Sequence, residues 1–262
     1  MIQISPDRVT PELRSMFDLK MPTGIRAFAV LAGGNRGKIF TDDPARPQWC
    51  LVWEADDGTL YRGGKYDADV LSEAVALLRQ DGVVALGFRE GDLDVNRFPS
   101  DPDAGAECLE FDRPVGSCDI SPYLGALPDG FSVHRMDRAL LECSPKQDEN
   151  LNRYGSVENF LDKGIAVCVL HGDKTVAEAY ADMDIMGVRE IGIRTQEAYR
   201  RQGFATIACA HLIKLCEETG SSIYWDCAKY NAGSVALAHR LGFQNERNYK
   251  LLAWFKQKEK TS

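Results

Sequence analysis

The fold of this chain is decided by the stretch Glu190-Ile-Gly-Ile-Arg-Thr-Gln-Glu-Ala-Tyr-Arg-Arg-Gln-Gly-Phe-Ala205. Its first six residues alternate, with Ile191, Ile193 and Thr195 on one face, and this period of two predicts a β-strand. A polar connection follows. From Gly203 onward, apolar residues recur at helical spacing: Phe204, Ile207, Ala208, Leu212, Leu215 and Cys216. The stretch therefore predicts a strand, a cationic glycine-bearing loop and a helix.

The start of the predicted helix is a candidate anion site. The first backbone N–H groups of a helix have no partner within it, and they lie at the positive end of the helix dipole. Together these features suit phosphate oxygens. Arg200 and Arg201 add two positive charges in a chain of net charge −8. The alternative is an ordinary helix start with surface arginines.

A second motif follows a predicted strand over Ser222–Cys227. It reads Asn231-Ala-Gly-Ser-Val-Ala-Leu-Ala-His-Arg-Leu-Gly-Phe243. The pair of motifs resembles the GNAT acyltransferases. Residues 200–205 resemble the pyrophosphate loop of that family, Arg/Gln-x-x-Gly-x-Gly/Ala, and the second motif resembles its closing signature. One helix and one strand separate the two, as in the family, and the resemblance covers Ile165 to Phe255.

This resemblance implies acetyl-CoA as co-substrate. Backbone groups of the central strand would pair with the pantetheine arm, and N–H groups of the loop would hold the pyrophosphate, with Arg200 adding charge. Asn231 and Ser234 would lie beside the pantetheine, although Asn231 could equally be a plain helix N-cap, or serve both purposes. The implied cofactor-binding residues are Ile191, Ile193, Thr195, Arg200, Arg201, Gln202, Gly203, Phe204, Ala205, Asn231 and Ser234.

Catalytic residues are less clearly marked. Glu190 lies near the position where many family members carry a carboxylate that deprotonates the amine, directly or through water. The alternative is a solvent-facing strand residue, and Glu178 is a second candidate. Ala238 stands where many members place a tyrosine that protonates the leaving thiolate. Either water protonates the thiolate, or another tyrosine does so, or the protein performs little chemistry.

The function implied by the resemblance is N-acetyl transfer from acetyl-CoA to a primary amine of a small molecule or peptide. Two alternatives belong to other classes. One is a non-catalytic acyl-CoA-binding or regulatory protein, and the other is an interaction domain that has kept only the fold. The acceptor cannot be predicted from the sequence, and a homodimer is left open.

The composition argues against several other classes. Hydrophobic residues make up 44% of the 262 positions and charged residues 27%, as in globular proteins generally. The net charge of −8 disfavours binding to nucleic acid or to an anionic membrane. No apolar run approaches membrane-spanning length, and the N-terminus lacks a signal-peptide pattern. The eight cysteines form no Cys-x-x-Cys pair and no zinc-spaced cluster, so we expect no metal, reduced thiols and a cytoplasmic protein.

The region Ser117–Gly130 is rich in proline and glycine and predicts a domain boundary. We expect a mixed α/β accessory domain over 1–125 and an α/β domain of GNAT fold with a mixed sheet over 126–262. The accessory domain could be a degenerate copy of the same fold. Predicted helices are 11–19, 69–80 and 156–163; predicted strands are 26–31, 39–41, 48–54, 59–62, 83–88, 131–142, 165–171 and 174–183.

Overall fold

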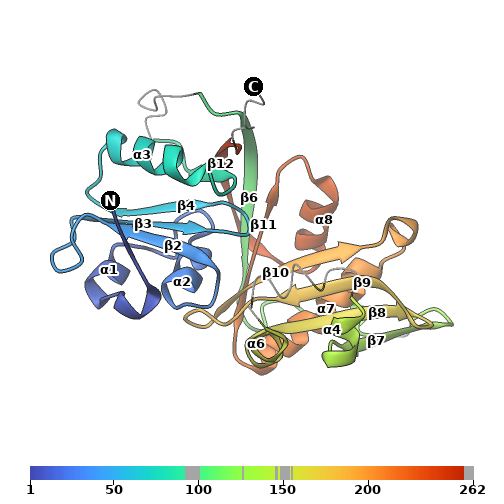
Figure 1. The fold of residues 1–262 in the computed structure, drawn as a ribbon. Helices are drawn as coiled ribbons and strands as arrows, with labels where there is room; N and C mark the ends of the chain where they lie inside the picture. Colours follow the sequence, from blue (N-terminus) through green and yellow to red (C-terminus); the bar gives the residue numbers. More distant parts are fainter. Residues whose placement is uncertain (92–100, 126, 145–146, 148–153, 155, 257–262) are drawn as a thin grey trace, which may run out of the picture. The chain divides into compact units, whose positions relative to one another are not determined.

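The computed structural model describes residues 1–91, 101–125, 127–144, 147, 154 and 156–256 (Figure 1). Contacts divide the chain into two compact units. Unit 1 comprises Met1–Cys108 and Asn248–Ser262, and unit 2 comprises Leu109–Arg247. The strands β6 (Ala104–Arg113) and β12 (Gln244–Trp254) have residues in both units. The predicted boundary between residues 125 and 126 stays a prediction, and the division by contacts falls elsewhere.

Unit 1 contains an antiparallel sheet in the order β1-β2-β3-β4 and a separate pairing of β5 with β12. Its core is built around three buried tryptophans, Trp49, Trp53 and Trp254, together with the apolar side of α3. The elements are β1 (Ile2–Ile4), α1 (Pro11–Ser15), α2 (Gly24–Leu31), β2 (Gly37–Thr41), β3 (Trp49–Glu54), β4 (Leu60–Gly64), α3 (Ala68–Leu78) and β5 (Val84–Phe88).

One predicted element of unit 1 is wrong. Residues 26–31 were expected as a strand and form most of helix α2. Apart from Arg26, every residue of this helix is buried, so its sequence is an almost continuous apolar run. A short, continuous apolar run cannot be told apart as strand or helix by periodicity. Burial on all sides therefore removed the signal on which the prediction depended.

Glu54 at the end of β3 gives unit 1 a pH-dependent stability. The side chain is 1% exposed, and its Oε2 accepts a hydrogen bond from the Asp57 backbone N–H at 2.9 Å. Burial raises the pKa of this carboxyl from 4.5 to about 7. The folded state therefore binds more protons than the unfolded state between these two values, so stability falls as pH rises through them.

We expect Glu54→Gln to remove this dependence, because glutamine keeps the acceptor oxygen and cannot ionise. Above pH 7 the variant should exceed the wild type by up to roughly 3 kcal/mol in unfolding free energy, with no such gain near pH 4.5. Urea unfolding at several pH values measures the difference. Parallel pH profiles for the two proteins would contradict the prediction.

The sheet of unit 2 runs in the order β6-β11-β10-β9-β8-β7. The β10–β11 pair is parallel, whereas β7–β8, β8–β9 and β9–β10 are antiparallel. The elements are β7 (Phe131–Arg135), α4 (Arg138–Glu142), α6 (Val157–Lys163), β8 (Ile165–His171), β9 (Lys174–Ala181), β10 (Val188–Thr195), α7 (Phe204–Glu218), β11 (Ser222–Ala228) and α8 (Ala232–Arg240).

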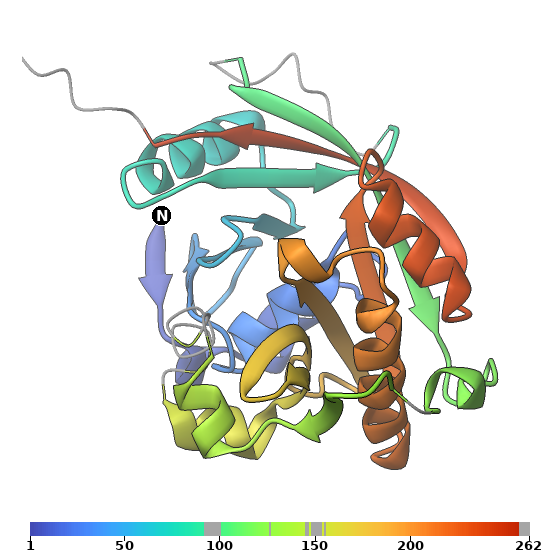
Figure 2. The ribbon, with the colours of Figure 1, turned by 90° about the vertical axis from the view of Figure 1, so that its right-hand side faces the viewer.

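Alternation along β8 sends side chains to two separate cores. Val167 and Val169 pack with the apolar side of α7, whereas Ala166 and Cys168 pack with residues of α4 and α6. Successive strand residues point to opposite faces, so α7 and the pair α4 and α6 cover opposite faces of the sheet (Figure 2). The faces of β10 are thereby assigned as well, because Ile191 belongs to the core formed with α7.

The predicted strand 131–142 is corrected by the structure. β7 ends at Arg135, and a short helix, α4, occupies Arg138–Glu142. Asp137 is its N-cap, with a side chain that accepts from the Leu140 backbone N–H. This capping aspartate is a helix-start signal that the strand prediction overlooked. The predicted helix 156–163 is confirmed as α6, capped by Ser156, and the elements predicted from residue 165 onward are also confirmed.

Candidate active site

Strands β10 and β11 separate after a short parallel contact. Their register covers only three pairs, from Val188 opposite Ser222 to Glu190 opposite Tyr224, although β10 continues to Thr195. On the other side of β10, the Asp182 N–H donates to the Glu190 carbonyl at 2.9 Å. In an antiparallel ladder, alternate residues direct their backbone groups to the partner strand. The backbone N–H and C=O groups of even-numbered β10 residues therefore point toward β9. Those of odd-numbered residues point toward the open side.

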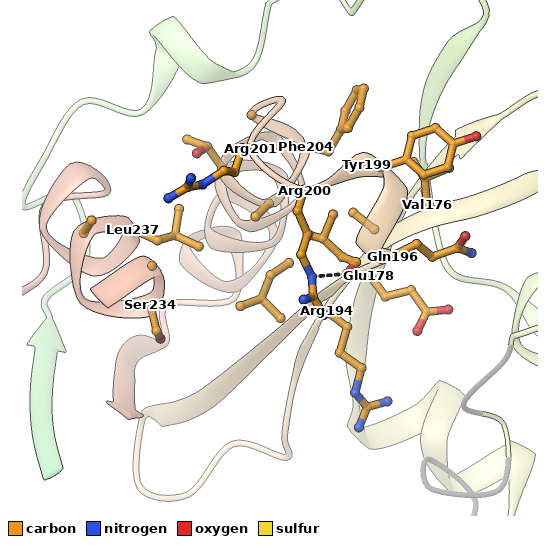
Figure 3. A pocket seen from close by; sticks show the side chains of 18 of the residues that line it. Val176, Glu178, Arg194, Gln196, Tyr199, Arg200, Arg201, Phe204, Ser234 and Leu237 are labelled. Atoms are coloured by element: carbon orange, nitrogen blue, oxygen red, sulfur yellow. Dashed lines mark hydrogen bonds between the residues drawn. The ribbon is translucent and has the colours of Figure 1, made fainter. Parts of the chain in front are cut away.

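A cavity of about 1080 Å³ lies in unit 2 at this opening (Figure 3). It is bordered by β9, the end of β10, the loop that follows, the first turn of α7 and the cavity-facing side of α8. The lining residues are Thr175, Val176, Ala177, Glu178, Ile193, Arg194, Thr195, Gln196, Tyr199, Arg200, Arg201, Gly203, Phe204, Ala205, Thr206, Asn231, Ala232, Gly233, Ser234, Ala236, Leu237 and Arg240.

The loop before α7 borders this cavity with Arg200, Arg201 and Gly203. Arg201 has φ 64° and Gly203 has φ 91°, so two residues close together are left-handed. Successive N–H groups near such left-handed residues form anion-binding concavities. Gly203 is the N-cap of α7 and provides no side chain to cap the helix. The first N–H groups of the helix are thus left to a ligand or to water.

The two adjacent arginines have different roles. Arg200 Nε donates to the Thr195 carbonyl at 3.3 Å, so this side chain turns back onto β10 (Figure 3). Arg201 extends in the direction of α8 in the same view. The hydroxyl Oγ1 of Thr195 is buried and has no hydrogen-bond partner among the described residues. A buried hydroxyl without a partner is costly, and a ligand in the cavity would satisfy it.

Asn231 and Ser234 lie on the other wall, at the start of α8. The Asn231 side chain caps the helix, because its Oδ1 accepts from the Ser234 backbone N–H at 3.2 Å. The Ser234 hydroxyl accepts from Trp225 Nε1 at 3.0 Å. The N-cap alternative for Asn231 is confirmed, and contact with a ligand stays a prediction for both residues.

Two buried carboxylates lie on the α4 and α6 face of β9 and β10. Glu178 stands opposite Arg194 in the register of the two strands, and its Oε1 accepts from the Ser144 hydroxyl at 2.7 Å. Glu178 and Glu190 are 7% and 8% exposed. Only Glu178 lines the cavity, because it faces the end of β10, where that strand has parted from β11.

A match to a known protein family shows which family this chain belongs to. The model of the family described as "GNAT acetyltransferase" matches residues 109–252, more than half of the chain. The chain belongs to the GNAT acetyltransferase family. The prediction of GNAT membership is thereby confirmed.

A curated relative and several solved structures agree with this assignment. The uncharacterized N-acetyltransferase YdfB of Bacillus subtilis (strain 168) is 32% identical over 127 residues, 48% of this GNAT chain. The match spans about half the length of that relative, 49%. A GCN5-related N-acetyltransferase-like protein from Streptococcus suis aligns with a TM-score of 0.68 at 22% identity, over 92% of this chain and 97% of its own.

A tandem GNAT protein from the clavulanic acid biosynthesis pathway aligns with a TM-score of 0.64 at 9% identity, over 97% of this chain and 94% of its own. At such identities the likeness shows the fold alone. It extends over both units, and it confirms the predicted fold class, a GNAT fold preceded by a smaller mixed α/β part.

Most of the predicted cofactor-binding residues of this GNAT chain gather at the cavity. Those that line it are Ile193, Thr195, Arg200, Arg201, Gly203, Phe204, Ala205, Asn231 and Ser234. Glu190, Ile191 and Gln202 do not line it. Ile191 is buried in the core with α7, and Gln202 Nε2 donates to the Ala198 carbonyl at 3.1 Å. The roles of all twelve residues stay predictions.

Sequence reasoning missed Arg194, Tyr199 and Arg240 as lining residues. A signal for Arg240 was available: Gly233, Leu237 and Arg240 recur at helical spacing after the capping asparagine, which places them on one side of α8. Arg194 could not be found in this way, because its place depends on how far β10 and β11 stay paired.

Position 238, where many GNAT family members carry a tyrosine, faces the protein interior. Ala238 is fully buried in the core with α7, and the neighbouring His239 pairs with Glu246 at 3.2 Å on the surface. Tyr199 is the one tyrosine among the described residues that line the cavity. Its hydroxyl lies 3.1 Å from His171 Nδ1. Tyr224 is engaged elsewhere, since its hydroxyl donates to Glu110 Oε2 at 2.7 Å.

Two absences concern the described residues only. No helix in the described ranges combines the length and the apolar character needed to cross a membrane. Nor do the described histidine, cysteine, aspartate and glutamate side chains form a group of three or more that could hold a metal ion. All eight cysteines are described, and none of them forms a disulfide.

Proposed function

We propose that this chain transfers an acetyl group from acetyl-CoA to a primary amine of a small molecule or peptide. The observation that carries the proposal is the combination of an open strand edge and an uncapped helix start in one cavity. β10 continues to Thr195 after its last register pair with β11 at Glu190, and α7 begins at Gly203 without a side-chain cap. A thioester with a long amide-bearing arm and a diphosphate fits both.

The donor would be held along β10. Because odd-numbered residues direct their backbone groups to the open side, Ile193 can pair with pantetheine amides as an added strand would. The Thr195 hydroxyl offers a further hydrogen bond. The diphosphate would lie against the N–H groups that follow Arg201, at the positive end of α7. The proposed cofactor is thus bound chiefly by backbone groups.

The cavity meets both faces of β10, which suits transfer between two substrates. Ile193 and Thr195 lie on the α7 face, whereas Arg194 and Glu178 lie on the opposite face. The amine would attack the thioester carbonyl from the second face, where Glu178 can accept its proton. Glu190 remains the alternative base proposed from the sequence, acting through water. The thiolate of CoA is a tolerable leaving group, so a protein acid is not required.

A non-catalytic acyl-CoA-binding protein is the second candidate, because the usual tyrosine position is the buried Ala238. The two functions differ in turnover and not in binding. Incubation with acetyl-CoA and a panel of primary amines, with trapping of free thiol, separates them. We expect thiol release above background with at least one amine. Binding without release across a broad panel would favour the second candidate.

Binding itself is tested by thermal unfolding. Acetyl-CoA at a hundred times its Kd should stabilise the protein by about 2.7 kcal/mol, because it binds only the folded state. Arg200→Glu should abolish this gain, since it places a negative charge beside the phosphate loop and frees the Thr195 carbonyl. An unchanged melting temperature at millimolar acetyl-CoA would leave an interaction domain that has kept only the fold.

A further inference from the structure

The cavity holds more positive charge than a diphosphate on backbone N–H groups requires. Its described lining contains four arginines and one carboxylate: Arg194, Arg200, Arg201, Arg240 and Glu178. The chain as a whole has a net charge of −8. A local excess of three positive charges in an acidic protein marks a site for a polyanionic ligand.

The four arginines fall into two pairs. Arg194 stands opposite Glu178 in the β9–β10 register, and Arg200 is bonded to the Thr195 carbonyl. Arg201 and Arg240 differ from these. Within the part of the chain that the structure describes, neither makes a hydrogen bond or an ion pair. Two guanidinium groups on separate elements therefore border one cavity without a partner among the described residues.

The placement of this second pair is fixed by its two elements. Arg201 is held left-handed at φ 64°, and its side chain extends in the direction of α8 (Figure 3). Arg240 is the last residue of α8, on the same side of that helix as Gly233 and Leu237, which also line the cavity. The two arginines therefore border the cavity from the loop and from the far end of α8.

We propose that Arg201 and Arg240 form a second phosphate subsite, which takes the 3′-phosphate of the CoA ribose. This proposal rests on the proposed function. A phosphomonoester carries up to two negative charges at neutral pH and accepts bidentate hydrogen bonds from guanidinium groups. The subsite would make the protein select CoA thioesters over thioesters that lack this phosphate, such as those of 3′-dephospho-CoA.

An ordinary role for Arg240 would be to complement the negative end of the α8 dipole. That role would not distinguish between two ligands, whereas the proposed subsite does. The test is therefore a ratio of two dissociation constants. CoA and 3′-dephospho-CoA are titrated calorimetrically into the wild-type chain, Arg201→Ala, Arg240→Ala and the control Lys214→Ala. Lys214 is an exposed residue of α7 outside the cavity lining. Lys214→Ala therefore removes one positive charge, as the arginine variants do, without changing the cavity.

We expect the wild type to bind CoA about 10- to 100-fold more tightly than 3′-dephospho-CoA, as for charge-assisted hydrogen bonds. Arg201→Ala and Arg240→Ala should each bring this ratio below about 3 by weakening CoA alone, and Lys214→Ala should keep it. Unchanged melting temperatures of the variants without ligand would show that they remain folded.

Three results would overturn the subsite, and they separate it from the proposed function. Equal affinity of the wild type for the two ligands would remove the subsite and leave acetyl-CoA binding intact. Equal weakening of both ligands by the arginine variants would assign these residues to the diphosphate instead. Failure of the wild type to bind either ligand would refute the proposed function, and the subsite with it.

Discussion

Replacement of Glu178 by glutamine is expected to lower kcat by a factor of about 10² to 10⁴, the usual contribution of a general base. Glutamine keeps an acceptor for the Ser144 hydroxyl, which donates to Glu178 Oε1 at 2.7 Å. It cannot take a proton from the amine. The Kd of acetyl-CoA should change by less than about twofold, because CoA would be held mainly by backbone groups. Steady-state kinetics and calorimetry measure the two quantities.

Glu190→Gln is the matched control. Both carboxylates are buried on the same face of the sheet, so the two substitutions remove similar charges from similar surroundings. Only Glu178 lines the cavity. We therefore expect a smaller loss of kcat for Glu190→Gln. The reverse order would make Glu190 the base, as the sequence prediction has it, and a loss below tenfold in both variants would remove both residues from the proton transfer.

The loop before α7 and the helix itself were predictable because their signals are local. Gly203 supplies a positive φ that most residues avoid, and the apolar spacing from Phe204 to Cys216 defines one side of α7. Each signal lies within a few residues of the structure that it determines. The same holds for Asn231, whose side chain caps α8 three residues before Ser234.

The difference between Glu178 and Glu190 could not be predicted, because it arises from strand pairing. The sequence shows both residues on β-strands, at positions that alternate with apolar neighbours. Which of them reaches the cavity depends on the register of β10 with β9 and on the point where β11 separates from β10. Long-range pairing of this kind leaves no mark in a single strand.

Replacement of Gly203 by alanine is expected to weaken the binding of acetyl-CoA about 100-fold or more. In the free protein, a Cβ at this position would meet nothing within 4 Å. Crowding by the protein therefore does not explain why this residue is a glycine. Its φ of 91° and its place in the cavity lining supply the reasons. An added methyl would stand where the diphosphate approaches and would displace the first N–H groups of α7. The loss of two charge-assisted hydrogen bonds accounts for roughly 3 to 6 kcal/mol.

Gly220→Ala separates this effect from the cost of a left-handed alanine. Gly220 follows the other end of α7 at φ 77°, and a Cβ there would also meet nothing within 4 Å. Both variants should lose a similar stability, about 1 to 2 kcal/mol, because both force a side chain into the left-handed region. Only Gly203→Ala should lose acetyl-CoA. If the two variants bound acetyl-CoA equally well, the diphosphate would not lie against the start of α7, and the donor site would have to be sought elsewhere in the cavity.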